Sequence, residues 1–427
     1  MPRVAALVVW FIARAESQSD CNRCTDHTPV TQGSFSAHTF VPDSGCYHGV
    51  PDVADTFALL AGSWVVTMGG SNSWATYTAL ANQMQPGYYD FHPERSNGGG
   101  AQFSELIWER QSDGTWSLVH DSFVCSEGGC DGESSQWHTT DMSAAKFPAE
   151  GLPQHSANHI RLTFFEARLY PESTLGLEYL NDALNGWNAA RQIIYVQNGR
   201  WYANGRAGTP EGYHPDLLTF LTDHTGFCGQ SNVDCFIATI SCVTELTVEL
   251  WKWSKCDSGV NDLNQITEDL TLLPQFSAFH YMDVTSLLSA KAEEYAGHNG
   301  PPLGLWTWWT VFNALPEAVE AFGDSRAVCP ETVEFDDSCF VWSDSALTVW
   351  RECQDCGCPD YASNAAAIGE VSKEWICLMY RPCSYSRTWP VNRPLPPPLP
   401  SPPPPLPPPP PPLPPTPPPP PPPPPPP

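Results

Sequence analysis

Ser71 is a serine whose surroundings suggest covalent chemistry. It follows the apolar run at 65–68 and the pair Gly69-Gly70, a pattern typical of a buried strand that ends in a tight turn. The apolar residues after the turn recur at helical spacing, which predicts a helix from about residue 71 to residue 86. The first N–H groups of a helix lack internal partners, so those at Gly70 to Asn72 could hold the oxyanion of an acyl transfer. The sequence therefore indicates Ser71 as a nucleophile, although such a turn could also simply join a strand to a helix.

The elements expected to position Ser71 form an α/β fold. Apolar segments at 65–68, 159–169, 192–197, 236–253 and 276–284 could be strands, and helical or irregular stretches separate them. The connections between these strands are long enough to hold helices, which predicts a largely parallel sheet with flanking helices. Ligands of such sheets bind beyond the carboxyl ends of the strands, which is where Ser71 falls.

Three sequence blocks, taken in order, resemble one hydrolase family. They are Met68-Gly69-Gly70-Ser71-Asn72, Gly199-Arg200-Trp201-Tyr202 and Asp283-Val284-Thr285-Ser286-Leu287. Together they are similar to the PC-esterase branch of the SGNH/GDSL hydrolases, which includes the plant trichome birefringence-like polysaccharide O-acetyltransferases. The resemblance spans roughly residues 60 to 350, and it implies an SGNH-like sheet.

The resemblance also implies roles for individual residues. Ser71 would be the nucleophile, with Gly70 standing where the family has Asp, and the oxyanion would be held at Gly70, Asn72 and Gly199. The second block is Gly-His-Trp-Trp in the family, so Arg200 and Tyr202 are departures from it. Arg200 and Trp201 would contact substrate, and Trp201 could instead fill the core. The third block is Asp-Ile-Thr-x-Leu-Ser followed by a His in the family, which is similar to residues 283–289 and then His298 here. Asp283 and His298 are therefore candidates for the orienting acid and the general base.

The last block of the family is where this chain departs most. Family members carry Asp-x-x-His within Cys-x-His-Trp-Cys, whereas the most similar stretch here, residues 336–342, has Ser338 and Val341 in those two places. A serine without a base is a poor nucleophile at neutral pH. Three explanations stay open: the true block lies elsewhere; His298 or His280 acts as the base with Asp283 or Glu294; or the protein keeps the fold without catalysis.

The N-terminus and the cysteines predict secretion. Arg3, the apolar run at 4–13 and the small-x-small site Ala13-Arg14-Ala15 are typical of a signal peptide. All 16 cysteines follow it, an even number that allows up to eight disulfides in an oxidising compartment. Cys21 and Cys24, and the group at 353–358, also have metal-ligand spacing, but disulfides are favoured and no metal or other cofactor is expected. We expect a secreted, matrix or cell-wall protein, with the Golgi lumen as the alternative.

Charge and aromatic residues narrow the class of partner. A formal charge of −27 argues against nucleic acid or an anionic membrane as a partner, because both require a basic face. A neutral polysaccharide or glycan fits better. The run at 303–315 contains Trp306, Trp308 and Trp309, and it is too short for a membrane helix. Its tryptophans are expected to be buried or to face carbohydrate.

The C-terminus is a proline tract. Residues 394–427 hold 28 prolines, which predicts an extended polyproline II rod. Ser401-Pro402-Pro403-Pro404-Pro405 resembles the Ser-Pro₄ unit of extensins, which suggests attachment to wall or matrix polymers. The predicted organisation is a signal peptide at 1–15, a Cys-containing N-terminal extension at 16–60, an SGNH-like α/β domain at 61–328, a Cys-rich C-terminal subdomain at 329–393 and the tail at 394–427.

These observations favour a secreted carbohydrate O-acetyl esterase or O-acetyltransferase with a serine nucleophile. One alternative is a non-catalytic wall or matrix protein that retains the SGNH-like fold. A third interpretation is a cytosolic scaffold whose proline tract binds polyproline-recognising modules, which would require that residues 1–15 do not direct secretion.

Overall fold

The computed structural model describes most of residues 28–316 and a few short segments outside them. The described residues are 22–23, 28–36, 39–44, 46–85, 101–125, 158–184, 190–203, 205, 208–242, 256, 258–289, 301–316, 333–335 and 385–387. The predicted signal peptide, the proline tract and most of the predicted C-terminal subdomain lie outside these residues.

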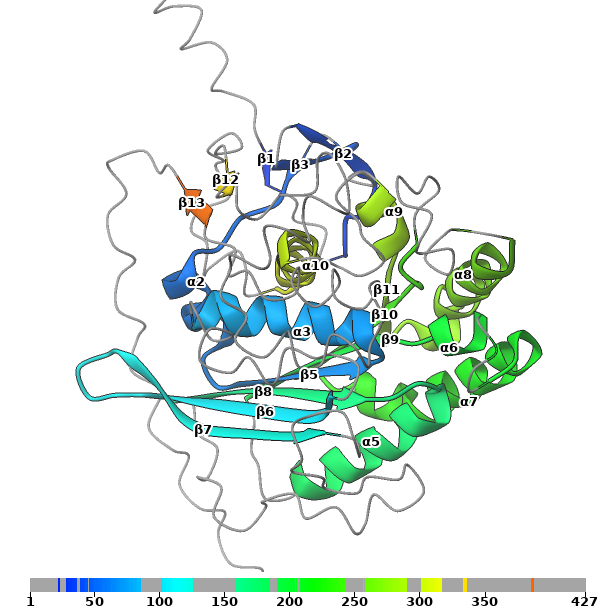
Figure 1. Ribbon diagram of the computed structural model, residues 1–427, viewed down its shortest axis with the longest axis horizontal. Coiled ribbons are helices and arrows are strands. Elements are labelled where there is room, and N and C mark those ends of the chain that lie inside the picture. The colour runs from blue at the N-terminus through cyan, green and yellow to red at the C-terminus, as the bar shows by residue number, and fades with distance from the viewer. Residues whose placement is uncertain are drawn as a thin grey trace, which may run out of the picture. The chain divides into compact units, whose positions relative to one another are not determined.

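A seven-stranded sheet forms the centre of the described fold (Figure 1). Its strands, in spatial order, are β11 (Phe279–Met282), β10 (Val233–Ala238), β9 (Arg191–Gln197), β5 (Ser63–Gly69), β8 (His159–Glu166), β6 (Ala101–Arg110) and β7 (Trp116–Cys125). The first five are mutually parallel, and β6 runs antiparallel to β8 and to β7. The predicted α/β fold with a largely parallel sheet is therefore confirmed.

Helices cover both faces of this sheet. One face packs against α2 (Val53–Leu60), α3 (Ser71–Met84), α9 (Val284–Ser289) and α10 (Pro301–Ala314). The other face packs against α5 (Tyr170–Leu184), α6 (Arg200–Ala203), α7 (Pro210–Cys228) and α8 (Ser258–Thr271), with the 3₁₀ turn η4 (Pro274–Phe276) before β11. Because every residue of β5 is buried, this strand is apolar on both faces, as is typical of a central parallel strand.

The parallel strands follow a doubly wound order. Numbered as they occur in the chain, β5, β8, β9, β10 and β11 lie in the spatial order 2-1-3-4-5. The helix after β5 covers one face, whereas the helices after β8, β9 and β10 cover the other. The chain therefore leaves the neighbouring strands β5 and β9 toward opposite faces, and this arrangement defines a topological switch point at their carboxyl ends.

The tryptophan-rich segment at 303–315 forms α10, which lies beside α3 (Figure 1). Trp306, Trp308 and Trp309 are almost completely buried, and the Trp308 indole donates a hydrogen bond to the carbonyl of Thr76 at 2.7 Å. Of the two interpretations of this segment, burial is confirmed and a carbohydrate-facing role is excluded for these three side chains. Among the described residues, no helix combines the length and apolarity needed to cross a membrane.

The predicted N-terminal extension packs directly onto the α/β core. It contains two two-stranded sheets, one of β1 (Asn22–Arg23) with β4 (Cys46–Tyr47) and one of β2 (Gly33–Ser36) with β3 (Thr39–Pro42). Phe40 is buried in the core, and Asn313 of α10 exchanges hydrogen bonds with both the N–H and the carbonyl of Gly49. The predicted C-terminal subdomain contributes the described pair β12 (Val333–Phe335) and β13 (Tyr385–Arg387).

Two disulfides join described cysteines, which confirms the predicted disulfide bonding for this part of the chain. Cys228 at the end of α7 bonds to Cys235 in β10. Cys242, just beyond β10, bonds to Cys256, just before α8. The second disulfide therefore closes a loop at the carboxyl edge of the sheet.

Candidate functional site

Ser71 is the first residue of α3 and follows β5 after a single turn residue. Gly70 is the N-cap, with extended backbone angles, and its carbonyl accepts the first helical hydrogen bond, from the Trp74 N–H at 3.0 Å. The backbone N–H groups of Ser71, Asn72 and Ser73 therefore have no acceptor within the helix. The predicted strand, glycine turn and helix are present, and only the side chain of Ser71 lies outside the described part.

The switch point brings together the first two blocks of the resemblance. Gly69, the last residue of β5, is paired with Gln197, the last residue of β9. The residues that follow each of them, 70–72 and 198–201, therefore lie side by side at the carboxyl edge of the sheet. In doubly wound sheets this is where ligands bind.

Two glycines allow these turns to approach each other closely. Gly69 has φ of +144°, and a Cβ there would lie 2.4 Å from the carbonyl oxygen of Gln197 and closer still to Ser73 Oγ. Gly199 has φ of +115°, and its Cβ would lie 2.6 Å from Ile240. Both positions therefore require glycine, for backbone conformation and for space.

Trp201 lies against the turn that carries Ser71. A Cβ at Gly70 would be 2.9 Å from the indole nitrogen of Trp201 and 3.5 Å from Cδ1, and no other atom of the described residues beyond its chain neighbours lies within 4 Å. The pyrrole edge of the indole therefore faces Gly70. The structure thus places Trp201, which the sequence indicated as a substrate-binding residue, directly beside the residue that precedes the candidate nucleophile.

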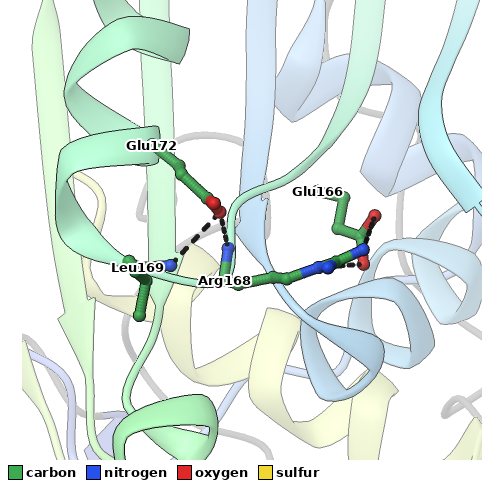
Figure 2. A network of polar contacts seen from close by, with 4 residues as sticks. All are labelled: Glu166, Arg168, Leu169 and Glu172. Carbon is green, nitrogen blue, oxygen red and sulfur yellow. Dashed lines mark hydrogen bonds and ion pairs between the residues drawn. The ribbon is translucent and has the colours of Figure 1, made fainter. Parts of the chain in front are cut away.

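A charged pair that the sequence reasoning missed adjoins Trp201 (Figure 2). Glu166, the last residue of β8, is paired with Gly69 and accepts hydrogen bonds from Arg168 Nε at 3.2 Å and Arg168 Nη2 at 3.4 Å. The Arg168 guanidinium also lies 5.0 Å from the centre of the Trp201 ring, which is a cation–π contact. Glu166, Arg168, Trp201 and Gly70 therefore form a continuous series of contacts along the carboxyl edge.

Local interactions fix this pair. Glu172 in the first turn of α5 accepts hydrogen bonds from the backbone N–H groups of Arg168 at 2.5 Å and Leu169 at 3.4 Å (Figure 2). Burial raises the pKa of Glu166 above its usual value, and Arg168 only partly offsets this effect. The charged residues Glu166 and Arg168 at the end of the apolar segment 159–169 were the sequence signal available for this pair.

Arg200 joins the end of β9 to the loop after β10. Its guanidinium donates a hydrogen bond to the backbone carbonyl of Ser241, next to the cysteine of the Cys242–Cys256 disulfide. The predicted substrate-binding Arg200 therefore has a described partner in the protein backbone, at the same edge of the sheet as Trp201.

Three buried side-chain amides lie at the carboxyl ends of β5 and β9. Asn72, Gln197 and Asn198 are each more than nine-tenths buried, and their amide oxygens accept no hydrogen bond within the described chain. The Asn198 Nδ2 group donates to Ser173 Oγ at 2.7 Å, so the orientation of this side chain is held by α5.

Asp283 lies at the carboxyl end of β11 and caps α9. Its carboxylate accepts hydrogen bonds from the Ser286 N–H and from Gln32 Nε2, both at 3.0 Å. Strands β10 and β9 separate it from β5, which is a displacement of roughly 14 Å across the sheet at the usual strand spacing. His298, Glu294 and residues 336–342 lie outside the described residues.

His280, the other histidine considered as a base, lies on β11 and faces the amino half of the sheet. Its Nε2 is 3.8 Å from the carboxylate of Asp234, which also accepts a 2.8 Å hydrogen bond from Arg191 at the start of β9. Burial alone would raise the pKa of Asp234, but the hydrogen bonds from His280 and Arg191 outweigh it and lower the pKa. His280 thus pairs with Asp234 three strands away from the Ser71 turn.

Comparisons with known proteins add no family assignment. No protein-family model matches the chain, and a search of curated proteins finds no similar sequence. Within the described part of the chain, no three His, Cys, Asp or Glu side chains are grouped as a metal ion would require.

Proposed function

We propose that this protein is a carbohydrate O-acetyl esterase or O-acetyltransferase of SGNH-like fold, with Ser71 as its nucleophile. The observation that carries the proposal is the adjacency of two turns, 70–72 after β5 and 198–201 after β9, at the switch point of the sheet. These are the first two blocks of the PC-esterase resemblance, and they lie far apart in the sequence.

The proposed chemistry is acyl transfer through a serine ester. The Ser71 oxygen attacks the acetyl carbonyl carbon, its proton passes to the base, and the carbonyl π electrons move to the oxygen. Backbone N–H groups at Gly70, Asn72 and Gly199 would stabilise this oxyanion. Collapse expels the sugar hydroxyl, which takes the proton, and leaves an acetyl ester on Ser71. Water then releases acetate in an esterase, or a second sugar hydroxyl accepts the acetyl group in a transferase.

Under this proposal His298 takes the role of the base, with Asp283 orienting it, because the position of the family's catalytic histidine is Val341 here. Arg200 and Trp201 border the acyl site from β9.

We also propose that the protein acts after secretion, in a matrix or cell wall. The two disulfides support this, because such bonds persist in oxidising compartments. The proline tract at 394–427 would then hold the α/β domain near wall or matrix polymers, and a polysaccharide or glycan would be the substrate.

A second candidate function is a non-catalytic matrix protein of the same fold. The presence of Val341 where the family has its catalytic histidine favours it. Such a protein would bind polysaccharide without releasing acetate.

Acetate release from acetylated xylan and from a chromogenic acetate ester tests the proposal. The full mature chain, produced with its disulfides, is compared with Ser71→Ala and with Ser117→Ala, which changes an exposed serine of β7. Loss of release in Ser71→Ala alone is the expected result. Equal background release by all three proteins would overturn the enzymatic proposal and favour the second candidate.

A further inference from the structure

We propose that the indole N–H of Trp201 donates a hydrogen bond to the acyl oxygen, and that Arg168 and Glu166 are positioning residues that hold the indole for this purpose. This inference rests on the proposed acyl transfer at Ser71 and adds a side-chain donor to its oxyanion site. The proposed donor is the N–H group at the edge of the Trp201 ring, whereas a sugar would stack on one face of that ring.

The position of the indole nitrogen is the first argument. Nε1 and Cδ1 are the atoms of Trp201 that approach a Cβ position at Gly70, at 2.9 and 3.5 Å. The polar edge of the ring therefore faces the turn that precedes Ser71. Within the described chain no acceptor binds this N–H, and the nearby Gly70 carbonyl already accepts the Trp74 N–H.

The contacts on the ring face are the second argument. The Arg168 guanidinium lies over Trp201 at 5.0 Å and is held by two hydrogen bonds to Glu166. The backbone of Glu166 is paired with that of Gly69 in the sheet. One face of the indole is therefore occupied by a cation, and the N–H edge is the polar group that Trp201 presents to the turn. Figure 2 shows how Glu166 holds the Arg168 guanidinium that packs on this face.

The third argument is chemical. A neutral indole N–H donates a hydrogen bond and retains its proton, so it can stabilise a developing oxyanion without entering the proton transfers. Donors that are held in place before the reaction contribute most to stabilising the charge of the transition state. Removing one such donor typically lowers kcat by about 10²- to 10³-fold. The series Glu166, Arg168 and Trp201 supplies this fixed orientation.

Substitution of Trp201 by Phe tests the donor, because the ring remains and the N–H is removed. We expect kcat on the chromogenic acetate to fall by about 100-fold while KM changes by less than about twofold. Trp116→Phe, on β7, is the matched control and should retain full activity. Gly70→Ala should lower kcat similarly, because its Cβ displaces the indole while the extended backbone at residue 70 accepts alanine.

The test of the positioning residues is spectroscopic. In protein labelled with ¹⁵N-tryptophan, the Trp201 indole signal is identified by its loss in Trp201→Phe. Reaction of Ser71 with an aryl phosphonate, which mimics the tetrahedral oxyanion, should move that signal downfield. In Arg168→Met the same signal should move by less than half as much, because the indole is no longer held.

The outcomes separate this inference from the proposed function. If Ser71→Ala abolishes activity but Trp201→Phe keeps kcat within twofold of the unmodified protein, the donor role of Trp201 is wrong. An indole signal that the phosphonate leaves unmoved would contradict it equally. If Ser71→Ala is as active as the unmodified protein, the proposed function fails and this inference fails with it.

Discussion

The indole nitrogen of Trp201 and the α-carbon of Gly70 lie so close that a Cβ at residue 70 would be 2.9 Å from that nitrogen. The family that the sequence resembles carries Asp at this position. A side chain at residue 70 and the present position of Trp201 exclude each other, so the two residues must be considered together.

Gly69→Ala is expected to destabilise the fold. Its φ of +144° disfavours any Cβ, and the added atom would clash with Ser73 Oγ and with the carbonyl of Gln197 at 2.4 Å. We expect the free energy of unfolding to fall by about 2–4 kcal/mol, measured by urea denaturation followed by circular dichroism.

Gly226→Ala is the matched control for that substitution. Gly226 is an exposed residue inside α7, and within the described part of the chain no atom outside its own helical surroundings lies within 4 Å of its Cβ position. Alanine there should raise the free energy of unfolding by about 0.5–1 kcal/mol, as in other helix interiors. Equal effects of the two substitutions would contradict the close approach of β5 and β9.

Much of the sheet could be predicted from the sequence. The runs at 65–68 and 192–197 are apolar on both faces, as central parallel strands require, and they form β5 and β9. The hairpin β6–β7 was missed because its strands mix apolar residues with charged ones such as Glu105, which is buried in an ion pair with Arg161. The strand expected at 236–253 begins earlier, at Val233, and ends at Ala238.

The contribution of Asp234 to stability should depend on pH. Its pKa is lowered in the folded protein by hydrogen bonds from His280 and Arg191, so its contribution is present above the unfolded-state pKa near 3.8 and is lost as the pH falls through the folded value. We expect Asp234→Asn to lower the free energy of unfolding by about 1–2 kcal/mol at pH 7 and by a smaller amount near pH 3, below the unfolded-state pKa. Urea denaturation of both proteins at the two pH values measures this, and a pH-independent difference would disagree with it.

The disulfide between Cys242 and Cys256 should stabilise the loop after β10. The bonded cysteines are 14 residues apart, and removing such a cross-link typically costs about 3 kcal/mol through the entropy of the unfolded chain. Replacing both cysteines with serine should therefore lower the free energy of unfolding by about that amount. The shorter Cys228–Cys235 link, replaced in the same way, serves for comparison and should cost slightly less. No loss in either double variant would show that the links do not constrain the chain.

The candidate site was predictable in part. Glycine and serine after an apolar run indicated the turn at Ser71, and the second block indicated Trp201. Glu166 and Arg168 are two residues apart, but their place beside Gly69 and Trp201 depends on strand β8 lying next to β5, and no local pattern encodes which strands become neighbours. Similarly, only the structure shows that His280 faces Asp234 and the amino half of the sheet.

The most direct test of the account is the site at which an aryl phosphonate reacts with the full mature chain. Mass spectrometry of the intact protein followed by peptide mapping would locate the adduct. The account predicts one adduct, on Ser71, which Ser71→Ala abolishes and Ser117→Ala retains. Absence of an adduct, or an adduct on another residue that persists in Ser71→Ala, would contradict it.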